Sequence, residues 1–359
     1  MKTVRISAEK LTIHKDKTIM DGLDLITKVG KNKHHNILLV IDDSKKLLGI
    51  INDGDIRRAF LKGFTQQSSV SDALKKTPVV APERFSQEDI IRIMKINKVD
   101  NLPIVDEQGR VLCVESLIDF NSENEKQVAI VMAGGEGERL RPLTDTIPKP
   151  MLEIDGKPLL QIIIEILRNY GYTDIILNVR YLGHIIKDYF KDGSNFKINI
   201  NYVQEPKPLG TAGSLGILPD ILKPDKPFLV VNGDLLTTLN FHAFLEFHIA
   251  ANYDFTLCGR PYEIKVPFGY PVINGDVVTE FKEKPTFKHL VNSGIYCMSP
   301  EMTEEVPENE YFDMPDLIRK IISKGKRVGV FPLREEFHEI GTHESYVEAE
   351  EFYKKMYRM

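Results

Sequence analysis

The sequence of 359 residues predicts an α/β protein in two parts, a larger sheet that is mostly parallel and a smaller α+β module ahead of it. Two observations predict this division. After residue 128, apolar strand runs alternate with amphipathic helices, which is typical of βαβ units with helices on both faces of a sheet. The first 120 residues instead contain an internal repeat of strands and short helices.

The repeat aligns residues 39–50 with residues 103–114 at a constant offset of 64. The same offset relates Asp55 to Asp119. Each copy reads as a strand, a polar turn, a second strand and a short helix. A further helix is expected ahead of each copy, at residues 19–28 and 87–95. Neither copy could bury its sheet alone, so we expect the two copies to pack together.

The second part begins after a polar run at residues 122–127, which is expected to be a linker. The domains are therefore placed at 1–121, with repeats of about 1–65 and 66–121, and at 128–359. Expected strands of the second domain lie at 128–132, 175–179, 198–202, 228–231 and 255–258. Expected helices lie at 158–170, 183–190, from about 211, and at 241–251. Ligands of such a sheet bind at the carboxyl ends of its strands.

Composition limits the class of protein. A hydrophobic content of 42% suffices for packed cores, and a formal charge of −5 gives no sign of nucleic-acid binding. No apolar run reaches 18 residues and the first residues lack an apolar signal segment, so we expect no membrane partner. The three cysteines lie far apart and are expected to be reduced. A soluble cytoplasmic protein is the expectation.

The most informative run is residues 129–150, AIVMAGGEGERLRPLTDTIPKP. An apolar strand passes directly into a glycine-rich loop, whose backbone N–H groups a phosphate can approach because no Cβ blocks them. Arg139, Arg141 and Lys149 follow and could neutralise a polyphosphate. The spacing fits neither a P-loop nor a dinucleotide-binding loop. The alternative is a tight turn with surface cations, and the continuation through PLT and PKP argues against it.

Four later segments fall where this architecture would place ligands. They are Gln204–Gly213, the Asn232-Gly233-Asp234 triplet, 281–285 (FKEKP), and Asn292-Ser293-Gly294 with 339–342 (EIGT). Asp234 ends an apolar strand, and such a carboxylate suits a hard divalent cation that bridges phosphates. Taken singly, a triplet of this kind is most often a plain turn, and the charges at 282–284 are most often solvated surface.

In this order and spacing, the segments resemble the sugar-1-phosphate nucleotidyltransferases over residues 128 to about 350. The resemblance implies a Rossmann-like, mixed and mostly parallel sheet, a nucleoside triphosphate and a sugar 1-phosphate as substrates, and Mg²⁺ as cofactor. The residues it makes catalytic are Arg139, Lys149, Asp234 and Lys284. The nucleotide would be bound by Ala133, Gly134, Gly135, Gly137, Gln204, Gly210 and Thr211. The sugar phosphate would be bound by Glu283, Lys284, Asn292 and Gly294. The metal would be held by Asp234 and Glu339.

The first domain resembles a pair of CBS motifs that form a Bateman module. The resemblance implies an adenine nucleotide in the clefts between the sheets, with Asp55 and Asp119 on the ribose. Asn52 stands where the family usually has Ser or Thr, and Cys113 stands where the first copy has Gly49. The alternative is a structural or dimerising module. The resemblance also implies a homo-oligomer, because helical faces of CBS pairs commonly associate.

The base and the sugar are poorly specified by sequence. A CBS pair fused ahead of such a transferase resembles the glucosamine-1-phosphate guanylyltransferases of bacterial legionaminic acid pathways. This resemblance favours GTP and glucosamine 1-phosphate. Mannose-1-phosphate guanylyltransferase and glucose-1-phosphate thymidylyl- or uridylyltransferase are the alternatives. A protein of a different class, a nucleotide sensor without catalytic activity, is the other hypothesis, and the presence of Lys149 and Asp234 argues against it.

Overall fold

The computed structural model describes residues 2–29, 37–74, 78–97, 99–118 and 127–357. The chain forms two compact units and passes from unit 1 to unit 2 at Lys126–Gln127, with the short stretch His242–Phe247 grouped with unit 1. Of the expected linker, Gln127 begins the first strand of unit 2, and the rest lies outside the described residues. Among the described residues, no helix is both long and apolar enough to cross a membrane.

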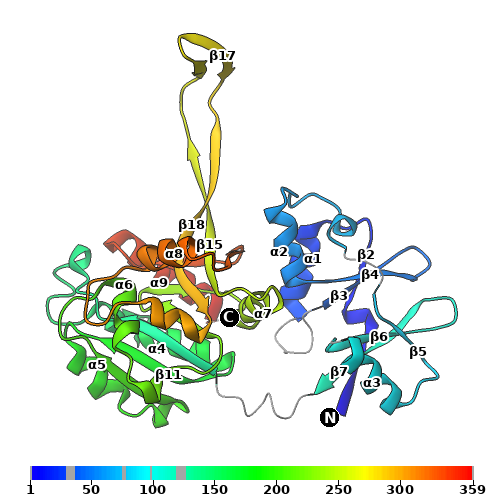
Figure 1. Cartoon of the computed structure of the whole chain (residues 1–359), viewed down its shortest axis with the longest axis horizontal. Helices are drawn as coiled ribbons and strands as arrows, with labels where there is room; N and C mark the ends of the chain where they lie inside the picture. Colours follow the sequence, from blue (N-terminus) through cyan, green and yellow to red (C-terminus); the bar gives the residue numbers. More distant parts are fainter. Residues whose placement is uncertain (1, 30–36, 75–77, 98, 119–126, 358–359) are drawn as a thin grey trace. The chain divides into compact units, whose positions relative to one another are not determined.

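Unit 1 contains two small sheets and the helices that cover them (Figure 1). Its strands are β1 (Lys2–Ser7), β2 (Thr12–His14), β3 (Ile37–Ile41), β4 (Leu47–Asn52), β5 (Ala81–Pro82), β6 (Asn101–Val105) and β7 (Val111–Ile118). Its α-helices are α1 (Ile19–Val29), α2 (Asp53–Leu61) and α3 (Gln87–Asn97). One sheet has the order β1-β7-β6-β5 and the other the order β2-β3-β4.

The structure confirms the internal repeat down to its register. The antiparallel pair β3–β4 runs from Ile37↔Asn52 to Ile41↔Leu47, and β6–β7 runs from Asn101↔Ser116 to Val105↔Val111. Both pairs have an irregularity before the last residue of the first strand. A core of residues from both copies joins the sheets, as expected: Ile6, Ala8, Leu11, Ile37, Leu39 and Val114. The helix expected after β7 lies outside the described residues.

Unit 2 holds a sheet of seven strands in the order β12-β11-β8-β13-β18-β15-β19. These strands are β8 (Gln127–Ala133), β11 (Tyr172–Val179), β12 (Asn199–Gln204), β13 (Phe228–Asn232), β15 (Phe255–Lys265), β18 (Thr286–Met298) and β19 (Val328–Pro332). All neighbours pair in parallel except β18, which is antiparallel to β13 and β15. The sheet is therefore mixed and mostly parallel, as the sequence predicts.

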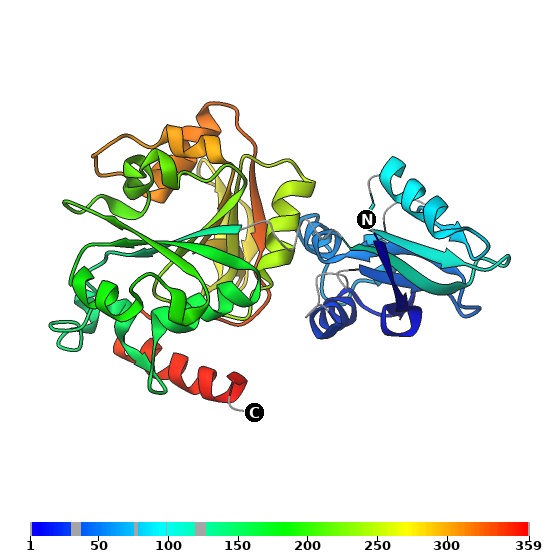
Figure 2. The ribbon, with the colours of Figure 1, turned by 90° about the horizontal axis from the view of Figure 1, so that it is seen from below.

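Shorter strands and the helices complete unit 2. The strands are β9 (Glu153–Ile154), β10 (Lys157–Pro158), β14 (Leu235–Thr237), β16 (Tyr270–Asn274), β17 (Val277–Lys282) and β20 (Phe337–Glu339). The α-helices are α4 (Leu159–Asn169), α5 (Gly183–Phe190), α6 (Gly210–Gly213), α7 (Phe241–Ala250), α8 (Met314–Ser323) and α9 (His343–Tyr357). Helices cover both faces of the sheet (Figure 2).

Successive side chains along the parallel strands point to opposite faces of the sheet, and both sets are buried. Ile130, Ile176 and Val230 join a core cluster with residues of α8. The residues that alternate with them, such as Val131 and Leu177, are fully buried too. Strands buried on both faces read as continuous apolar runs, which is why the sequence predicts them well.

Two expected elements differ from the structure. The strand expected at 255–258 runs on to Lys265 as β15, because its outer half pairs with β18 in a ribbon that the apolar run does not indicate. The helix expected from about residue 211 is only the four residues of α6, followed by a 3₁₀ turn. The remaining expected strands and helices of unit 2 agree with the structure to within a few residues.

Candidate active site

A cavity of about 690 Å³ lies where the parallel strands of unit 2 end. The registers place Ala133 beside Val179, and Val179 beside Gln204, at a common edge of the sheet. The residues that line the cavity come from the loops after these strands and from α6 and its surroundings. They include Ala133, Gly134, Gly135, Gly137, Arg139, Lys149, Asn178, Arg180, Glu205, Gly210, Thr211, Asp234 and Asp313.

The glycine loop that follows β8 lines this cavity. Nothing lies within 4 Å of a Cβ added at Gly135, so its backbone is open to a ligand. Gly137 has φ +64°, and an added Cβ would lie 2.9 Å from Cβ of Lys149. The hydroxyl of Thr144 donates to the carbonyl of Gly137 at 2.9 Å. The loop is thus held against the segment that carries the lysine, which is why glycine is required there.

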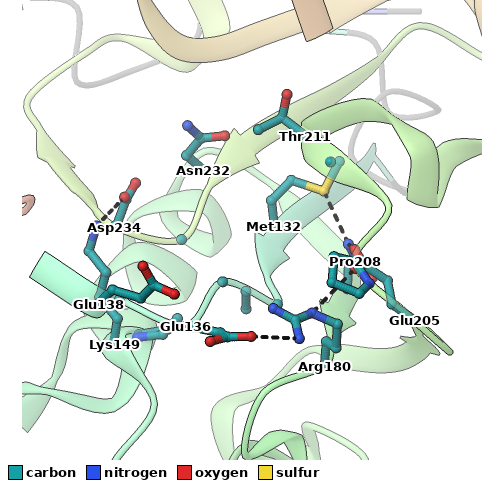
Figure 3. A pocket seen from close by; sticks show the side chains of 18 of the residues that line it. Met132, Glu136, Glu138, Lys149, Arg180, Glu205, Pro208, Thr211, Asn232 and Asp234 are labelled. Carbon is teal, nitrogen blue, oxygen red and sulfur yellow. Dashed lines mark hydrogen bonds and ion pairs between the residues drawn. The ribbon is translucent and has the colours of Figure 1, made fainter. Parts of the chain in front are cut away.

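Lys149 and Asp234 meet at one end of the cavity, although 85 residues separate them (Figure 3). Nζ of Lys149 donates to Oδ2 of Asp234 at 2.5 Å, and the side chains are only 11% and 24% exposed. Lys149 begins a 3₁₀ turn whose Pro150 and Met151 are buried. Arg139 borders the same end, with Nη2 at 3.3 Å from a Cβ added at Gly341. Two cations, Arg139 and Lys149, therefore border a loop whose backbone is open at Gly135.

The carboxylates at this end suit a divalent cation. Oδ1 of Asp234 is buried and has no hydrogen-bond partner among the described residues. The antiparallel pair β14–β20 sets Glu339 opposite Leu235, and the N–H of Ile340 donates to the carbonyl of Asp234 at 2.8 Å. Mg²⁺ is commonly held by one or two carboxylates together with water and phosphate oxygens. Asp234 and Glu339 fit that donor set.

A second polar cluster lies at the opposite end of the cavity (Figure 3). Glu205 is 7% exposed, and Oε1 accepts from Nδ2 of Asn178 at 2.5 Å. Arg180 lies between two carboxylates, with Nη1 3.1 Å from Glu136 and Nε 3.9 Å from Glu205. The motifs of the sequence did not indicate this cluster. A signal existed, because Arg180 directly follows an expected strand, at the edge where ligands bind.

Gln204 does not reach the cavity. It was expected to contact the base, but its side chain is exposed and accepts a hydrogen bond from Lys187 of α5 at 2.9 Å. Successive side chains of a strand point to opposite sides, and Gln204 is the last residue of β12. The next residue, Glu205, is the one that lines the cavity.

Gly210 and Thr211 line the cavity as expected and are held by Asp313. Oδ1 of Asp313 accepts from the N–H of Thr211 at 2.8 Å and from its hydroxyl at 3.1 Å. Gly210 has φ +78°, and an added Cβ would lie 2.7 Å from the same oxygen. Burial alone raises the pKa of Asp313, but hydrogen bonds from Thr211 and Tyr311 bring that pKa below its usual value. Asp313 therefore stays ionised beside the cavity.

Asn292 and Gly294 lie in an adjoining cavity of about 310 Å³. This cavity shares Thr211, Asp234 and Asp313 with the larger one and is also lined by Glu339. Nδ2 of Asn292 donates to the hydroxyl of Tyr296 at 2.6 Å. The expected sugar residues Asn292 and Gly294 are thus placed next to the expected metal ligands.

Glu283 and Lys284 are not brought to either cavity. They follow β17 and precede Thr286, the first residue of β18, whereas Asn292 lies six residues further on. At about 3.3 Å per residue in a strand, Thr286 is roughly 20 Å from Asn292. The sequence places the two segments close in the chain, but an extended strand separates them in space.

In unit 1, Asp55 has a structural role. Its backbone N–H donates to Oδ1 of Asn52 at 2.8 Å, and its carboxylate accepts from the N–H of Asn52 at 3.2 Å, which forms a capping box for α2. The carboxylate also pairs with Arg58 at 2.8 Å. Asn is a strong N-cap residue, which accounts for its presence at position 52. Asp119 lies outside the described residues.

Comparison with known families decides the class of unit 2. Residues 128–356 match the nucleotidyl transferase model, which is more than half of the chain. The chain belongs to the nucleotidyl transferase family. Residues 4–62 and 70–114 match the CBS domain model, so this nucleotidyl transferase carries CBS motifs at its N-terminus.

Two curated relatives each match about half of the chain. The chain is 34% identical over 217 residues to the UTP–glucose-1-phosphate uridylyltransferase of Synechocystis sp., with 55% of each chain covered. It is 36% identical over 184 residues to the mannose-1-phosphate guanyltransferase of Saccharomyces cerevisiae, which covers 49% of this chain and 50% of the relative. The nucleotidyl transferase thus spans about half the length of the curated relatives it matches.

Solved structures show the same fold. The crystal structure of HddC from Yersinia pseudotuberculosis is 28% identical with a TM-score of 0.51, and the match covers 64% of this chain and 100% of that one. HddC has also been solved in complex with GMP-PN, and that structure is 27% identical with a TM-score of 0.51, covering 64% and 100% of the two chains.

Proposed function

We propose that this nucleotidyl transferase moves a nucleotidyl group from a nucleoside triphosphate to a sugar 1-phosphate and releases pyrophosphate. The observation that carries the proposal is the meeting of the glycine loop with Lys149 and Asp234 at one end of a cavity whose other end is lined by Arg180 and the buried Glu205. The names of the uridylyl- and guanyltransferase relatives support this class of reaction.

The residues suit a reaction between two anions. A phosphate oxygen of the sugar 1-phosphate attacks the α-phosphorus in line, and the bond from that phosphorus to the bridging oxygen of pyrophosphate breaks. The attacking phosphate is already anionic, so no protein base is needed. Arg139 and Lys149 neutralise the charge where the phosphates meet, and the backbone at Gly135 binds oxygens of the triphosphate. Asp234 and Glu339 would hold Mg²⁺, which would supply further charge neutralisation for the phosphates.

Guanine is the base that we favour. Glu205 places a buried carboxylate at the base end of the cavity, and an ionised carboxylate only accepts hydrogen bonds. Guanine offers adjacent N1–H and N2–H donors to such a group, whereas uracil and thymine offer one donor between two carbonyl oxygens. The HddC complex with GMP-PN, a guanine nucleotide analogue by its printed name, is consistent with this preference.

Glucosamine 1-phosphate is the sugar substrate that we favour. The smaller cavity is lined by three carboxylates, Asp234, Asp313 and Glu339. A 2-ammonium group is attracted by such a set, since charge-assisted hydrogen bonds to carboxylates are the stronger kind. A guanylyltransferase of this specificity would serve legionaminic acid biosynthesis. The yeast relative favours mannose 1-phosphate as the second candidate, and the Synechocystis relative favours a uridylyltransferase acting on glucose 1-phosphate.

A matrix assay tests the reaction and its substrates. GTP, UTP, dTTP, CTP and ATP are each combined with glucosamine, mannose and glucose 1-phosphates, with Mg²⁺ present, and pyrophosphate release is measured. The highest kcat/KM is expected for GTP with glucosamine 1-phosphate. Nucleotide binding without pyrophosphate release in any combination would instead identify a nucleotide sensor.

The variant Lys149→Ala tests whether the activity arises in this cavity. The variant removes the cation that faces the glycine loop, so we expect a loss of most turnover, about 100-fold or more. Omitting Mg²⁺ with EDTA should abolish activity in the wild-type protein. Pyrophosphate release by Lys149→Ala at the wild-type rate would show that the reaction occurs elsewhere or is due to a contaminant.

A further inference from the structure

The larger cavity of unit 2 carries more carboxylates than cations. The described residues that line it include three cations and five carboxylates: Arg139, Lys149, Arg180, Glu136, Glu138, Glu205, Asp234 and Asp313. The proposed substrate is a triphosphate with several negative charges, and an unpaired carboxylate close to it would oppose its binding. Carboxylates in this cavity therefore need partners within the protein.

Glu136 is the carboxylate that belongs to the glycine loop itself. It lies between Gly135 and Gly137, and the backbone at Gly135 is open to a ligand. Its side chain is 34% exposed and turns toward Arg180, whose Nη1 lies 3.1 Å from Oε1 (Figure 3). This ion pair draws the charge of Glu136 toward the end of the cavity that is opposite Lys149.

Arg180 also faces a second carboxylate. Its Nε lies 3.9 Å from Oε2 of Glu205, the buried residue that follows β12. The side chain of Arg180 is only 21% exposed, so solvent screens these charges less than it would at the surface. One guanidinium therefore serves a carboxylate of the glycine loop and a carboxylate at the opposite end of the cavity.

Packing holds Arg180 beside the glycine loop. The residue directly follows β11, and a Cβ added at Gly134 would lie 3.3 Å from Cβ of Arg180. The N–H of the next residue, Tyr181, donates to the carbonyl of Gly134 at 3.4 Å. The loop thus passes directly against the arginine and is tied to the chain beside it.

A second cation near Glu136 is a weaker partner. Nη2 of Arg141 lies 3.9 Å from Oε2 of Glu136, its side chain is half exposed, and it also pairs with Asp145 at 3.5 Å. Exposed ion pairs of this kind contribute little, because water screens them. Neutralisation of Glu136 therefore depends mainly on Arg180.

We propose that Arg180 is a positioning residue: it neutralises Glu136, so that the glycine loop accepts the phosphates of the nucleotide. The arginine acts through Glu136 and contacts no phosphate itself, and no bond forms or breaks in this role. The mention of phosphates rests on the proposed function, whereas the pairing of Arg180 with two carboxylates is a property of the fold. Direct contact of Arg180 with the base is the competing assignment.

Binding of GTP, GDP and GMP to Arg180→Gln distinguishes these assignments. Isothermal titration calorimetry of the full chain measures each Kd without sugar phosphate. An unpaired Glu136 repels every additional phosphate, so we expect Kd to rise about 10- to 100-fold for GTP and less than about threefold for GMP. Equal weakening of all three nucleotides would indicate a contact with the base and would overturn the proposal, as would an unchanged Kd for GTP.

The double variant Glu136→Gln/Arg180→Gln separates charge from packing. Once the carboxylate of the loop is gone, the arginine has no charge to neutralise there, so the Kd for GTP should return to within about threefold of the wild type. A double variant that binds GTP as weakly as Arg180→Gln would show that the arginine acts in another way. If Arg180→Gln alone does not fold, the double variant decides by the same two outcomes.

Arg319→Gln is the matched control, because it removes an arginine from an exposed ion pair with Asp316 on α8. It should leave all three Kd values unchanged. If the wild type prefers another base in the matrix assay, the corresponding tri-, di- and monophosphates replace the guanine series. A wild type that binds no nucleotide would overturn the proposed function and this role with it. Normal binding with the same phosphate dependence in Arg180→Gln would overturn the role of Arg180 alone.

Discussion

At the scale of single residues, the two ends of the cavity carry different sets of charged side chains. Lys149 and Asp234 form an ion pair at the end where we propose that the phosphates react, and Glu205 and Arg180 occupy the opposite end (Figure 3). The cations are held by the fold before substrate arrives, so they need little reorganisation in the reaction. Preorganised charge of this kind is commonly the largest contribution to catalysis.

Replacing Glu205 by Gln should change the nucleotide preference. Gln keeps the size of the side chain but offers one acceptor and a donor group in place of two acceptors, so one hydrogen bond to guanine is lost. We expect the ratio of kcat/KM for GTP to that for UTP to fall about 10- to 100-fold, equivalent to roughly 1–3 kcal/mol. Steady-state kinetics with both nucleotides measure this ratio.

The matched control is Glu153→Gln, which makes the same change in an exposed side chain of β9. It should leave the ratio unchanged. An unchanged ratio in Glu205→Gln as well would show that Glu205 does not read the base, and the preference for guanine would then have to come from backbone contacts.

His248 of α7 provides a pH dependence of stability. Burial lowers its pKa to about 4, and Nδ1 lies 2.9 Å from Oγ1 of Thr256. Between pH 6.5 and 4 the unfolded chain binds a proton that the folded chain does not, so the free energy of unfolding falls as pH decreases through this range. The expected contribution at pH 5, relative to pH 7.5, is a loss of about 2 kcal/mol.

Urea unfolding at pH 7.5 and pH 5 checks this expectation in the wild type and in His248→Gln. Other groups also titrate, so the comparison between the two proteins is the relevant one. The variant should be less sensitive to acid, by an amount close to the contribution of the histidine. Equal acid sensitivity of both proteins would show that His248 is protonated in the folded state.

At the scale of elements, the glycine loop after β8 depends on the left-handed backbone conformation of Gly137. Gly137→Ala forces a Cβ to 2.9 Å from the side chain of Lys149 at φ +64°. We expect a loss of about 1–3 kcal/mol in the free energy of unfolding and a displaced lysine. Gly135→Ala is the matched control for stability, since nothing lies within 4 Å of its added Cβ.

Thermal unfolding distinguishes the two loop variants. Gly137→Ala should lower the Tm by several degrees, and Gly135→Ala should leave the Tm close to that of the wild type. If both variants keep the wild-type Tm, the loop can move away from Lys149 without cost, and the close approach of the two segments is not required for folding.

At the scale of the whole molecule, the role of unit 1 is less well defined by its residues than the role of unit 2. We propose that it binds an adenine nucleotide, as its CBS motifs suggest. AMP, ADP or ATP at 100 times its dissociation constant should then stabilise the protein by about 2.7 kcal/mol. Thermal unfolding of the full chain with each nucleotide measures this, with pyrophosphate release as a second readout of regulation.

Asp55→Ala is not a clean test of nucleotide binding, because Asp55 closes the capping box of α2 and pairs with Arg58. The variant should lose about 1 kcal/mol of stability without any nucleotide. If no adenine nucleotide changes either the Tm or the activity of the wild type, a structural or dimerising role for unit 1 is favoured instead.

The sequence by itself determined the class of fold, the internal repeat with its offset of 64 residues, and the glycine loop with its cations. These features are local, since apolar runs and turn residues a few positions apart specify strands and loops. It also pointed to Asp234, because a carboxylate after an apolar strand falls at the ligand-binding edge of a parallel sheet.

Only the tertiary structure decided which side chains share a cavity. Gln204 and Glu205 are neighbours in the chain, but strand alternation sends only Glu205 to the cavity. Glu283 and Lys284 precede Asn292 by a few residues, yet an extended ribbon carries them away from it. The spacing of residues in a sequence does not show which way their side chains point. That direction is set by the pairing of strands that are distant in the chain.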